Sequence, residues 1–184
     1  MRDMGSSQDR IREQVIVDRS KPEDAEEILK VIEEGWVASM VDEKRGADRE
    51  AVEHLFKQAR EIGLLKNFKK DIETEKGSKF LVAKKNNLVV GILQWEETPE
   101  SNTVISFFVK PEARGAGIPL LHGARRTMNP EKNVTLQVAA SKEDLHTFYK
   151  GLKFEFTGKD TYFEWETPKG KYSLHQLEMA RKLR

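Results

Sequence analysis

The segment from Phe107 to Leu121 joins an apolar stretch, a glycine-rich turn and the start of an apolar helix pattern. Gly115 and Gly117 let the backbone approach a ligand because neither residue has a Cβ. The free N–H groups at a helix start also attract an anion. The pattern therefore predicts a phosphate-binding turn, whose residues are Arg114, Gly115, Ala116, Gly117, Ile118, Pro119 and Leu120.

Two other phosphate-binding motifs do not fit this turn. The glycines are not followed by Lys-Ser or Lys-Thr, which a P-loop requires, and their spacing differs from that of the dinucleotide-binding fingerprint. A tight strand-to-helix turn with no ligand is the remaining alternative, since Gly115 and Gly117 serve that purpose equally well.

The elements that must position the turn alternate between strand and helix patterns. Runs of β-branched and aromatic residues predict strands at 15–17, 79–84, 88–95, 103–109, 134–139 and 154–158. Apolar residues at helical spacing predict helices over 25–36, 52–62, 120–128 and 145–152. Asn86 and Asn87 tolerate positive φ and predict a hairpin turn, while Ser20 with Glu23 and Ser141 with Asp144 predict helix starts.

A second motif follows the glycine turn at Phe148-Tyr149-Lys150-Gly151-Leu152-Lys153-Phe154. The order of elements resembles that of the GNAT N-acetyltransferase superfamily. It consists of a strand, the Arg-Gly-x-Gly turn, a helix, a second strand, and then a helix carrying Phe-Tyr before a third strand. In that family the stretch matching Pro111 to Ile118 binds pyrophosphate. The resemblance covers roughly residues 15–166.

The resemblance implies a mixed α/β fold with a central, mostly antiparallel sheet flanked by helices. Its two middle strands, 103–109 and 134–139, would run parallel and splay apart to admit acetyl-CoA as cosubstrate. Phe107, Phe108 and Val109 would join the cofactor-binding residues, and a backbone N–H of Phe108 or Val109 would meet the charge that develops on the thioester oxygen.

The expected reaction is transfer of an acetyl group to a primary amine. An ammonium group has no lone pair, so a base must remove its proton, and we expect Glu96 or its neighbour Glu97 in this role. The resemblance implies that Tyr149 donates a proton to the departing thiolate. No nucleophilic residue is evident, which favours direct attack of the amine on the thioester.

Several residues depart from the family pattern. Pro119 replaces a small residue and removes one N–H donor, Lys153 replaces a glycine, and Lys142 replaces a frequent asparagine. Gln137 stands where some members carry glutamate, and a glutamine cannot act as a base. These departures leave open a catalytically degenerate acyl-CoA-binding regulatory module, or a protein-interaction scaffold. The acceptor stays open among protein N-termini, lysines, polyamines and antibiotics.

Three further segments are candidates for binding. Arg125 and Arg126 follow the glycine turn and could meet the 3′-phosphate of CoA. Trp36 and Met40 fall where the acceptor pocket lies in the resembled fold. Leu174, Leu177 and Ala180 predict an amphipathic helix over 173–184 for docking or homodimer formation.

Length and composition limit the number of domains and the classes of partner that we expect. The chain has 184 residues, of which 38% are hydrophobic, so we expect one folded domain over 15–184 after a polar leader at 1–14. The net charge of +1 gives no reason to expect nucleic acid or an anionic membrane as partner. The absence of cysteine, signal peptide and long apolar stretch favours a cytoplasmic protein, and four dispersed histidines predict no metal site.

Overall fold

The structure is a computed structural model that describes residues 15–41, 48–74 and 77–182; the predicted leader at 1–14 lies outside them. Seven strands form one sheet in the order β1-β2-β3-β4-β5-β7-β6. All neighbouring strands are antiparallel except β4 and β5, which are parallel. This arrangement confirms the predicted fold class.

Most elements lie where the sequence predicted them, but α3 was not predicted and β7 replaces a predicted helix. The strands are β1 (Ile16–Arg19), β2 (Lys79–Lys85), β3 (Leu88–Glu97), β4 (Ser101–Val109), β5 (Asn133–Ala139), β6 (Glu155–Thr167) and β7 (Gly170–Arg181). The helices are α1 (Ala25–Met40), α2 (Arg49–Glu61), α3 (Leu64–Thr74), α4 (Gly117–Thr127) and α5 (Glu143–Gly151), with 3-10 turns η1 (Pro22–Asp24) and η2 (Pro111–Ala113). Asn86 and Asn87 have positive φ (53° and 65°), as the predicted hairpin turn requires.

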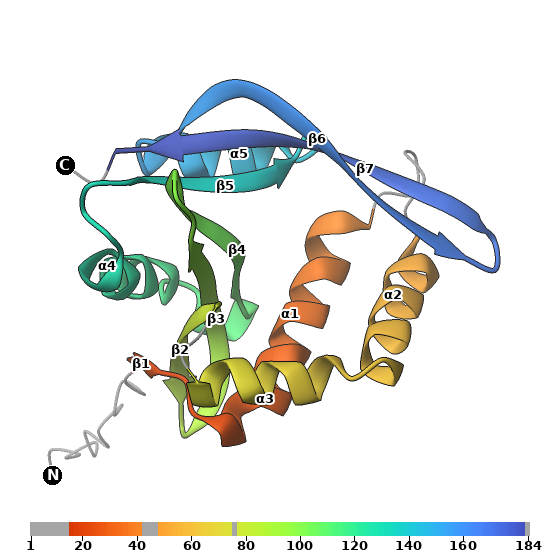
Figure 1. Cartoon of the computed structure of the whole chain (residues 1–184), viewed down its shortest axis with the longest axis horizontal. Helices are drawn as coiled ribbons and strands as arrows, with labels where there is room; N and C mark the ends of the chain where they lie inside the picture. Colours follow the sequence, from red (N-terminus) through yellow and green to blue (C-terminus); the bar gives the residue numbers. More distant parts are fainter. Residues whose placement is uncertain (1–14, 42–47, 75–76, 183–184) are drawn as a thin grey trace, which may run out of the picture.

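The sheet has a hydrophobic core on each face. Figure 1 shows α1 and α4 on opposite sides of β3 and β4. Successive side chains of a strand point to opposite faces, so Ile92 packs in the core with α1 and α2 while Leu93 packs in the core with α4. Both strands of the parallel pair therefore have neighbours above and below, which holds their backbones in place.

Helix α1 packs very close to β4. A Cβ on Gly35 would lie 2.3 Å from Cγ of Phe108, so only glycine allows this approach. Glycine inside a helix costs about 1 kcal/mol relative to alanine. The chain tolerates this cost because the close approach brings α1 against the strand that precedes the glycine turn.

The predicted helix over 173–184 is wrong for the residues that the structure describes, because they form β7. Its apolar residues occur at spacings of both three and two, since Leu177 and Met179 share one face of the strand. β7 lies between β5 and β6 and is paired with a strand on each side. These non-local backbone hydrogen bonds override the local helical pattern, and no docking helix remains in the described part of this segment.

Both predicted capping pairs are also wrong in their residues. Before α1, the N–H of Lys21 donates to the carboxylate of Asp24 (2.9 Å), and the Ser20–Glu23 pair plays no such part. The N-cap of α5 is Lys142, with no side-chain capping hydrogen bond. The helices still begin close to the predicted positions, because their apolar faces rather than their caps decide where they pack.

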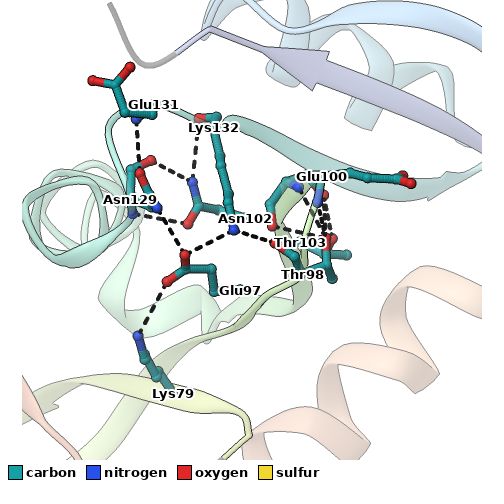
Figure 2. A network of polar contacts seen from close by, with 10 residues as sticks. Lys79, Glu97, Thr98, Glu100, Asn102, Thr103, Asn129, Glu131 and Lys132 are labelled. Atoms are coloured by element: carbon teal, nitrogen blue, oxygen red, sulfur yellow. Dashed lines mark hydrogen bonds and ion pairs between the residues drawn. The ribbon is translucent and has the colours of Figure 1, made fainter.

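A polar network holds β4 and β5 together at their beginnings (Figure 2). The buried side chain of Asn102 donates to the carbonyl of Asn129 (2.9 Å) and accepts from the N–H of the same residue (3.1 Å). Lys132 donates to the carbonyl of Thr98 and to the carboxylate of Glu97. The loop before β5 is thereby fixed to the turn before β4, and the parallel pair is closed at this end.

Candidate active site

The parallel pair opens at a bulge in β4. β4 and β5 are paired from Ser101 with Asn133 to Val104 with Leu136, and the pairing ends there. On the β3 side, Val104 lies opposite Trp95 and Ser106 lies opposite Gln94, so Ile105 is the extra residue of a β-bulge. The bulge turns the second half of β4 away from β5, which produces the predicted splay.

The peptide groups beyond the bulge alternate between β3 and the splay. The N–H of Lys110 donates to the carbonyl of Val90 (2.8 Å), which makes these two residues a hydrogen-bonded pair. In an antiparallel ladder such pairs alternate with pairs whose N–H groups point away. The N–H of Phe108 therefore faces β3, whereas those of Phe107 and Val109 face the splay. Of the two residues considered from the sequence, only Val109 directs its N–H into the gap.

A cleft of about 340 Å³ occupies the splay and reaches both faces of the sheet. On the α4 and α5 side it is lined by Val104, Phe107, Leu136, Val138, Leu145 and Tyr149. Trp36, Met40, Phe108 and Ala139 belong to the core on the α1 side. The rest of the lining consists of Ser39, Thr103, Ile105, Gln137, Phe163 and Gln176. A ligand entering from one face can therefore meet a second ligand entering from the other.

Tyr149 lies on the α5 side of this cleft. Its ring packs against Phe148 and Phe154, with ring centroids 5.2 and 5.8 Å away. Burial raises the pKa of its hydroxyl to about 12, because the phenolate would lose its hydration. Burial is the sole cause of this shift, and no hydrogen-bonding or charged neighbour among the described residues acts on the hydroxyl. Tyr149 is therefore a protonated donor throughout the neutral pH range.

The glycine turn and the start of α4 lie on the same face as Tyr149. Gly115 has φ of +106°, which only glycine adopts readily, and Phe107 lies 3.2 Å from the position of a Cβ on Gly117. The N–H of Leu120 is already bonded to the carbonyl of Ala116 (3.1 Å).

Only some backbone N–H groups of the glycine turn are available to bind an anion. Pro119 has no N–H, and the N–H groups of Arg114 and Ala116 donate to carbonyls within the turn. Within the part of the chain that the structure describes, the N–H groups of Gly115, Gly117 and Ile118 have no backbone acceptor. The predicted anion-binding turn is thus narrowed to three N–H donors.

The two glutamates at the end of β3 point to opposite faces. Glu97 faces the polar network, where hydrogen bonds from Asn129 and Lys132 hold the pKa of its carboxyl below the ordinary value. Glu96 faces the α1 side, where it accepts a hydrogen bond from the hydroxyl of Ser78 (2.6 Å). Glu96 does not line the cleft itself, but its cross-strand partner is Thr103, which does.

Three hydroxyl groups form a closed triangle at the narrow end of the splay. The oxygens of Ser101 and Thr103 are 2.9 Å apart, those of Thr103 and Thr135 are 3.2 Å apart, and those of Thr135 and Ser101 are 3.1 Å apart. This cluster was not predicted from the sequence. Ser101 and Thr103 are two residues apart and so share a strand face, which was a usable signal, but nothing local indicates that Thr135 lies beside them.

An aromatic wall forms the α1 side of the cleft. Trp36 contacts Phe56 of α2 and Phe163 of β6 edge-to-face, with ring centroids 5.8 and 5.3 Å away. Met40 lies one turn further along α1. Trp36 and Met40 were selected from the sequence, and both line the cleft. Phe163 was missed because only the pairing of β6 with β7 brings it to this position.

The other residues singled out in the sequence lie at separate sites in the structure. Arg125 and Arg126 are neighbours on α4 but line separate hollows, Arg126 beside Ile118 and Arg125 beside Phe154. Gln137 lines the cleft, as its family position implies. Lys153 adopts φ of +67°, which explains why a glycine is common at this position and why a lysine there costs about 1 kcal/mol.

The described residues contain neither a candidate metal site nor a helix able to span a membrane. No group of three or more His, Asp or Glu side chains is placed to hold a metal ion there. None of the helices in the described ranges is long and apolar enough to span a membrane.

A mostly antiparallel sheet with one splayed parallel pair, next to an Arg-Gly-x-Gly turn that opens a helix, defines the GNAT class of acyltransferase folds. A domain model described as an acetyltransferase (GNAT) domain matches residues 43–167 of the chain. The protein belongs to the GNAT acetyltransferase family. The sequence matches no protein with a curated description.

Solved structures share the fold at low sequence identity. The PaiA N-acetyltransferase of Thermoplasma acidophilum, solved with coenzyme A, has a TM-score of 0.66 at 17% identity, over 92% of this chain and 99% of that one. A probable acetyltransferase of Staphylococcus epidermidis has a TM-score of 0.68 at 8% identity, over 91% and 98%. The ribosomal-protein-S18-alanine N-acetyltransferase of Escherichia coli has a TM-score of 0.58 at 13% identity, over 92% and 94%.

Proposed function

We propose that this protein transfers an acetyl group from acetyl-CoA to a primary amine by direct attack. The observation that carries the proposal is the cleft that passes through the sheet at the splay, with the glycine turn and Tyr149 on one face and the aromatic wall on the other. Such a passage lets the acyl donor and the acceptor meet from opposite sides without a covalent enzyme intermediate.

The residues on the α4 side fit a pyrophosphate. The N–H groups of Gly115, Gly117 and Ile118 point out of a helix start that carries partial positive charge. Glycine at 117 permits a close approach to the backbone, and the side chains nearest to the position of a Cβ are those of Phe107 and Val109. The family relationship and the coenzyme A bound to the Thermoplasma protein support the same ligand for this chain.

Three groups of the chain would then act on the reacting atoms. The N–H of Val109 faces the splay and would stabilise the negative charge that develops on the thioester oxygen. The hydroxyl of Tyr149 would donate to the departing sulfur. Glu96 would accept the proton of the amine through water, because its cross-strand partner Thr103 lines the cleft and such pairs have Cβ atoms about 5 Å apart.

A thermal-shift titration tests the proposal at its first step. Saturation at a hundredfold excess over Kd stabilises the folded state by about 2.7 kcal/mol, so millimolar acetyl-CoA should raise the unfolding temperature clearly. Amine-dependent release of free CoA thiol, followed with a thiol reagent, tests the second step, and the absence of cysteine from the chain keeps the background low. No shift with acetyl-CoA or CoA would refute both catalysis and CoA sensing.

Gln137 supports one alternative. It occupies a position in the cleft where a carboxylate could serve as base, and a glutamine cannot accept the proton. A chain that binds acetyl-CoA but acetylates no amine would therefore be an acyl-CoA-binding regulatory module. The titration and the thiol assay together separate the two functions.

The Glu96→Gln variant should lose activity in a pH-dependent way. We expect kcat/KM for an alkylamine to fall by about 10²-fold at pH 7, because general bases typically contribute 10²- to 10⁴-fold. The loss should shrink as the pH rises towards the pKa of the amine, about 10.4 for a lysine-like group, because more of the amine arrives deprotonated.

Glu97→Gln is the matched control for this variant. Glu97 is the next residue of β3 but points to the other face, into the polar network. Its pH–rate profile should therefore keep the wild-type shape, even if the loss of the ion pair with Lys132 lowers stability. An unchanged rate for Glu96→Gln across the pH range would remove Glu96 from the mechanism.

A further inference from the structure

We propose that the acceptor is a primary amine carried on a bulky apolar group, which packs against Trp36, Met40 and Phe163 while the nitrogen lies near Thr103. This inference rests on the proposed function, because it names the class of substrate for the same cleft. It excludes polyamines and other polycations as preferred acceptors.

The aromatic wall is built in advance of binding. Phe56 is 6% exposed, and its contact with Trp36 fixes the indole from the α2 side. Phe163 fixes it from the β6 side and is itself 36% exposed, so part of its ring is open to the cleft. A rigid apolar surface binds an apolar group with little loss of side-chain entropy.

The aromatic wall is built by other elements than the α4 and α5 side of the cleft, where the cofactor is proposed to bind. We call the α1 side of the cleft its acceptor half. Its residues come from α1 and from the β6–β7 hairpin, which extends past α1 towards α2 in Figure 1. A phosphate at the glycine turn and a thioester at Val109 leave the α1 face of the cleft for the acceptor. The apolar part of the acceptor is therefore in contact with Trp36, Met40 and Phe163.

The opposite end of the acceptor half presents hydrogen-bond acceptors. The hydroxyls of Ser101, Thr103 and Thr135 can satisfy one another's O–H donors around their triangle, and each oxygen then keeps a lone pair. Thr103 carries its oxygen into the lining of the cleft, which also includes the amide side chains of Gln137 and Gln176. Such oxygens accept the N–H groups of a single amine without requiring a second charge on the acceptor.

The acceptor half of the cleft thus has an apolar surface at Trp36, Met40 and Phe163 and a polar surface at Thr103. An amine two or three bonds from an aromatic or branched aliphatic group spans both at once. Either a small arylalkylamine or a peptide with an apolar first residue has this chemistry, and the two sources can be distinguished by experiment.

The test measures kcat/KM for a panel of amines with the wild-type protein and saturating acetyl-CoA. The panel contains 2-phenylethylamine, the peptide Phe-Ala-Ala-amide, ethylamine and spermidine. We expect 2-phenylethylamine or the peptide to exceed ethylamine and spermidine by at least about tenfold, since one apolar group in a hydrophobic pocket typically changes kcat/KM by roughly 10- to 200-fold. A preference for the small amine or for the peptide identifies the source.

Phe163→Ala tests the contact itself, with Tyr162→Ala as the matched control. Tyr162 is the preceding residue on β6, points to the other face and stacks on His175. The Phe163 variant should lose about tenfold in kcat/KM for the aromatic acceptor but not for ethylamine, and its acetyl-CoA affinity should be unchanged. The Tyr162 variant should keep the wild-type preference. Phe163→Leu, which retains an apolar group, should recover part of the loss.

Two results would overturn the inference in distinguishable ways. If spermidine is the best acceptor, or if Phe163→Ala leaves the ratio of aromatic acceptor to ethylamine unchanged, the acceptor class is wrong while the transferase function stands. If acetyl-CoA binds but no amine in the panel releases CoA, the proposed function fails and the inference fails with it.

Discussion

Replacing Tyr149 by phenylalanine should lower kcat by about a hundredfold or more while leaving acetyl-CoA affinity nearly unchanged. A donor aimed at charge that develops in the transition state typically contributes 10²- to 10³-fold, and a general acid 10²- to 10⁴-fold. The phenylalanine keeps the ring that packs against Phe148 and Phe154 and loses only the hydroxyl. The measurement is kcat from the thiol assay, with Kd from calorimetric titration.

The raised pKa of Tyr149 determines whether its hydroxyl transfers a proton to the leaving sulfur or only donates a hydrogen bond to it. Burial raises this pKa to about 12, above the 8.5 of an ordinary thiol, so proton transfer to a hydrated thiolate would be unfavourable. The same burial acts on a thiolate inside the cleft and raises its proton affinity too. The hydroxyl therefore acts first as a hydrogen-bond donor to the sulfur. Because the phenol stays protonated up to about pH 11, kcat should show no fall from its ionisation at lower pH.

Stability provides the control for this variant. No hydrogen-bonding neighbour among the described residues contributes to the pKa shift of this hydroxyl, so its removal should change the free energy of unfolding by less than about 1 kcal/mol. A large loss of stability would indicate a structural role instead. A variant with unchanged kcat would show that another group, or water, stabilises the leaving sulfur.

Gly117→Val should weaken acetyl-CoA binding by roughly 10- to 150-fold. Each hydrogen bond to a charged group contributes about 1.5–3 kcal/mol, and the valine side chain would stand between the phosphate and the N–H groups of Gly115, Gly117 and Ile118. A Cβ at this position already lies 3.2 Å from the ring of Phe107, so the two γ-carbons are directed into the remaining space. Kd for acetyl-CoA and for CoA, measured by titration, checks the result.

Gly151→Val is the matched control, because a Cβ on Gly151 would have no atom within 4 Å. It places the same substitution in another helix, at a position with open space, and should leave the affinity at the wild-type value. Gly117→Ala should give an intermediate loss. If Gly117→Val folds and binds acetyl-CoA normally, the turn has only a structural role and the anion site must be sought elsewhere.

The sequence by itself determined the features that depend on local chemistry. Asn86 and Asn87 indicated the hairpin because few residues tolerate positive φ, and the hairpin is present. Gly115 and Gly117 indicated a turn into a helix because neither has a Cβ; Gly115 has φ of +106°, and α4 begins at Gly117. The order of strands and helices, read with the two family motifs, was sufficient for the fold class and the parallel middle pair.

The tertiary structure decided everything that depends on register and partner. A shift of one residue reverses the face of a strand side chain, so the sequence could not separate Glu96 from Glu97 or Phe108 from Val109. The bulge at Ile105, which no local pattern marks, sets the faces of the later β4 residues such as Phe108 and Val109 and opens the cleft. Pairing with β5 and β6 turned an apparent helix into β7, and the same hairpin carried Phe163 to the acceptor side. Contacts between segments far apart in the chain outweigh local preference here, because each strand gains its hydrogen bonds only from its neighbours.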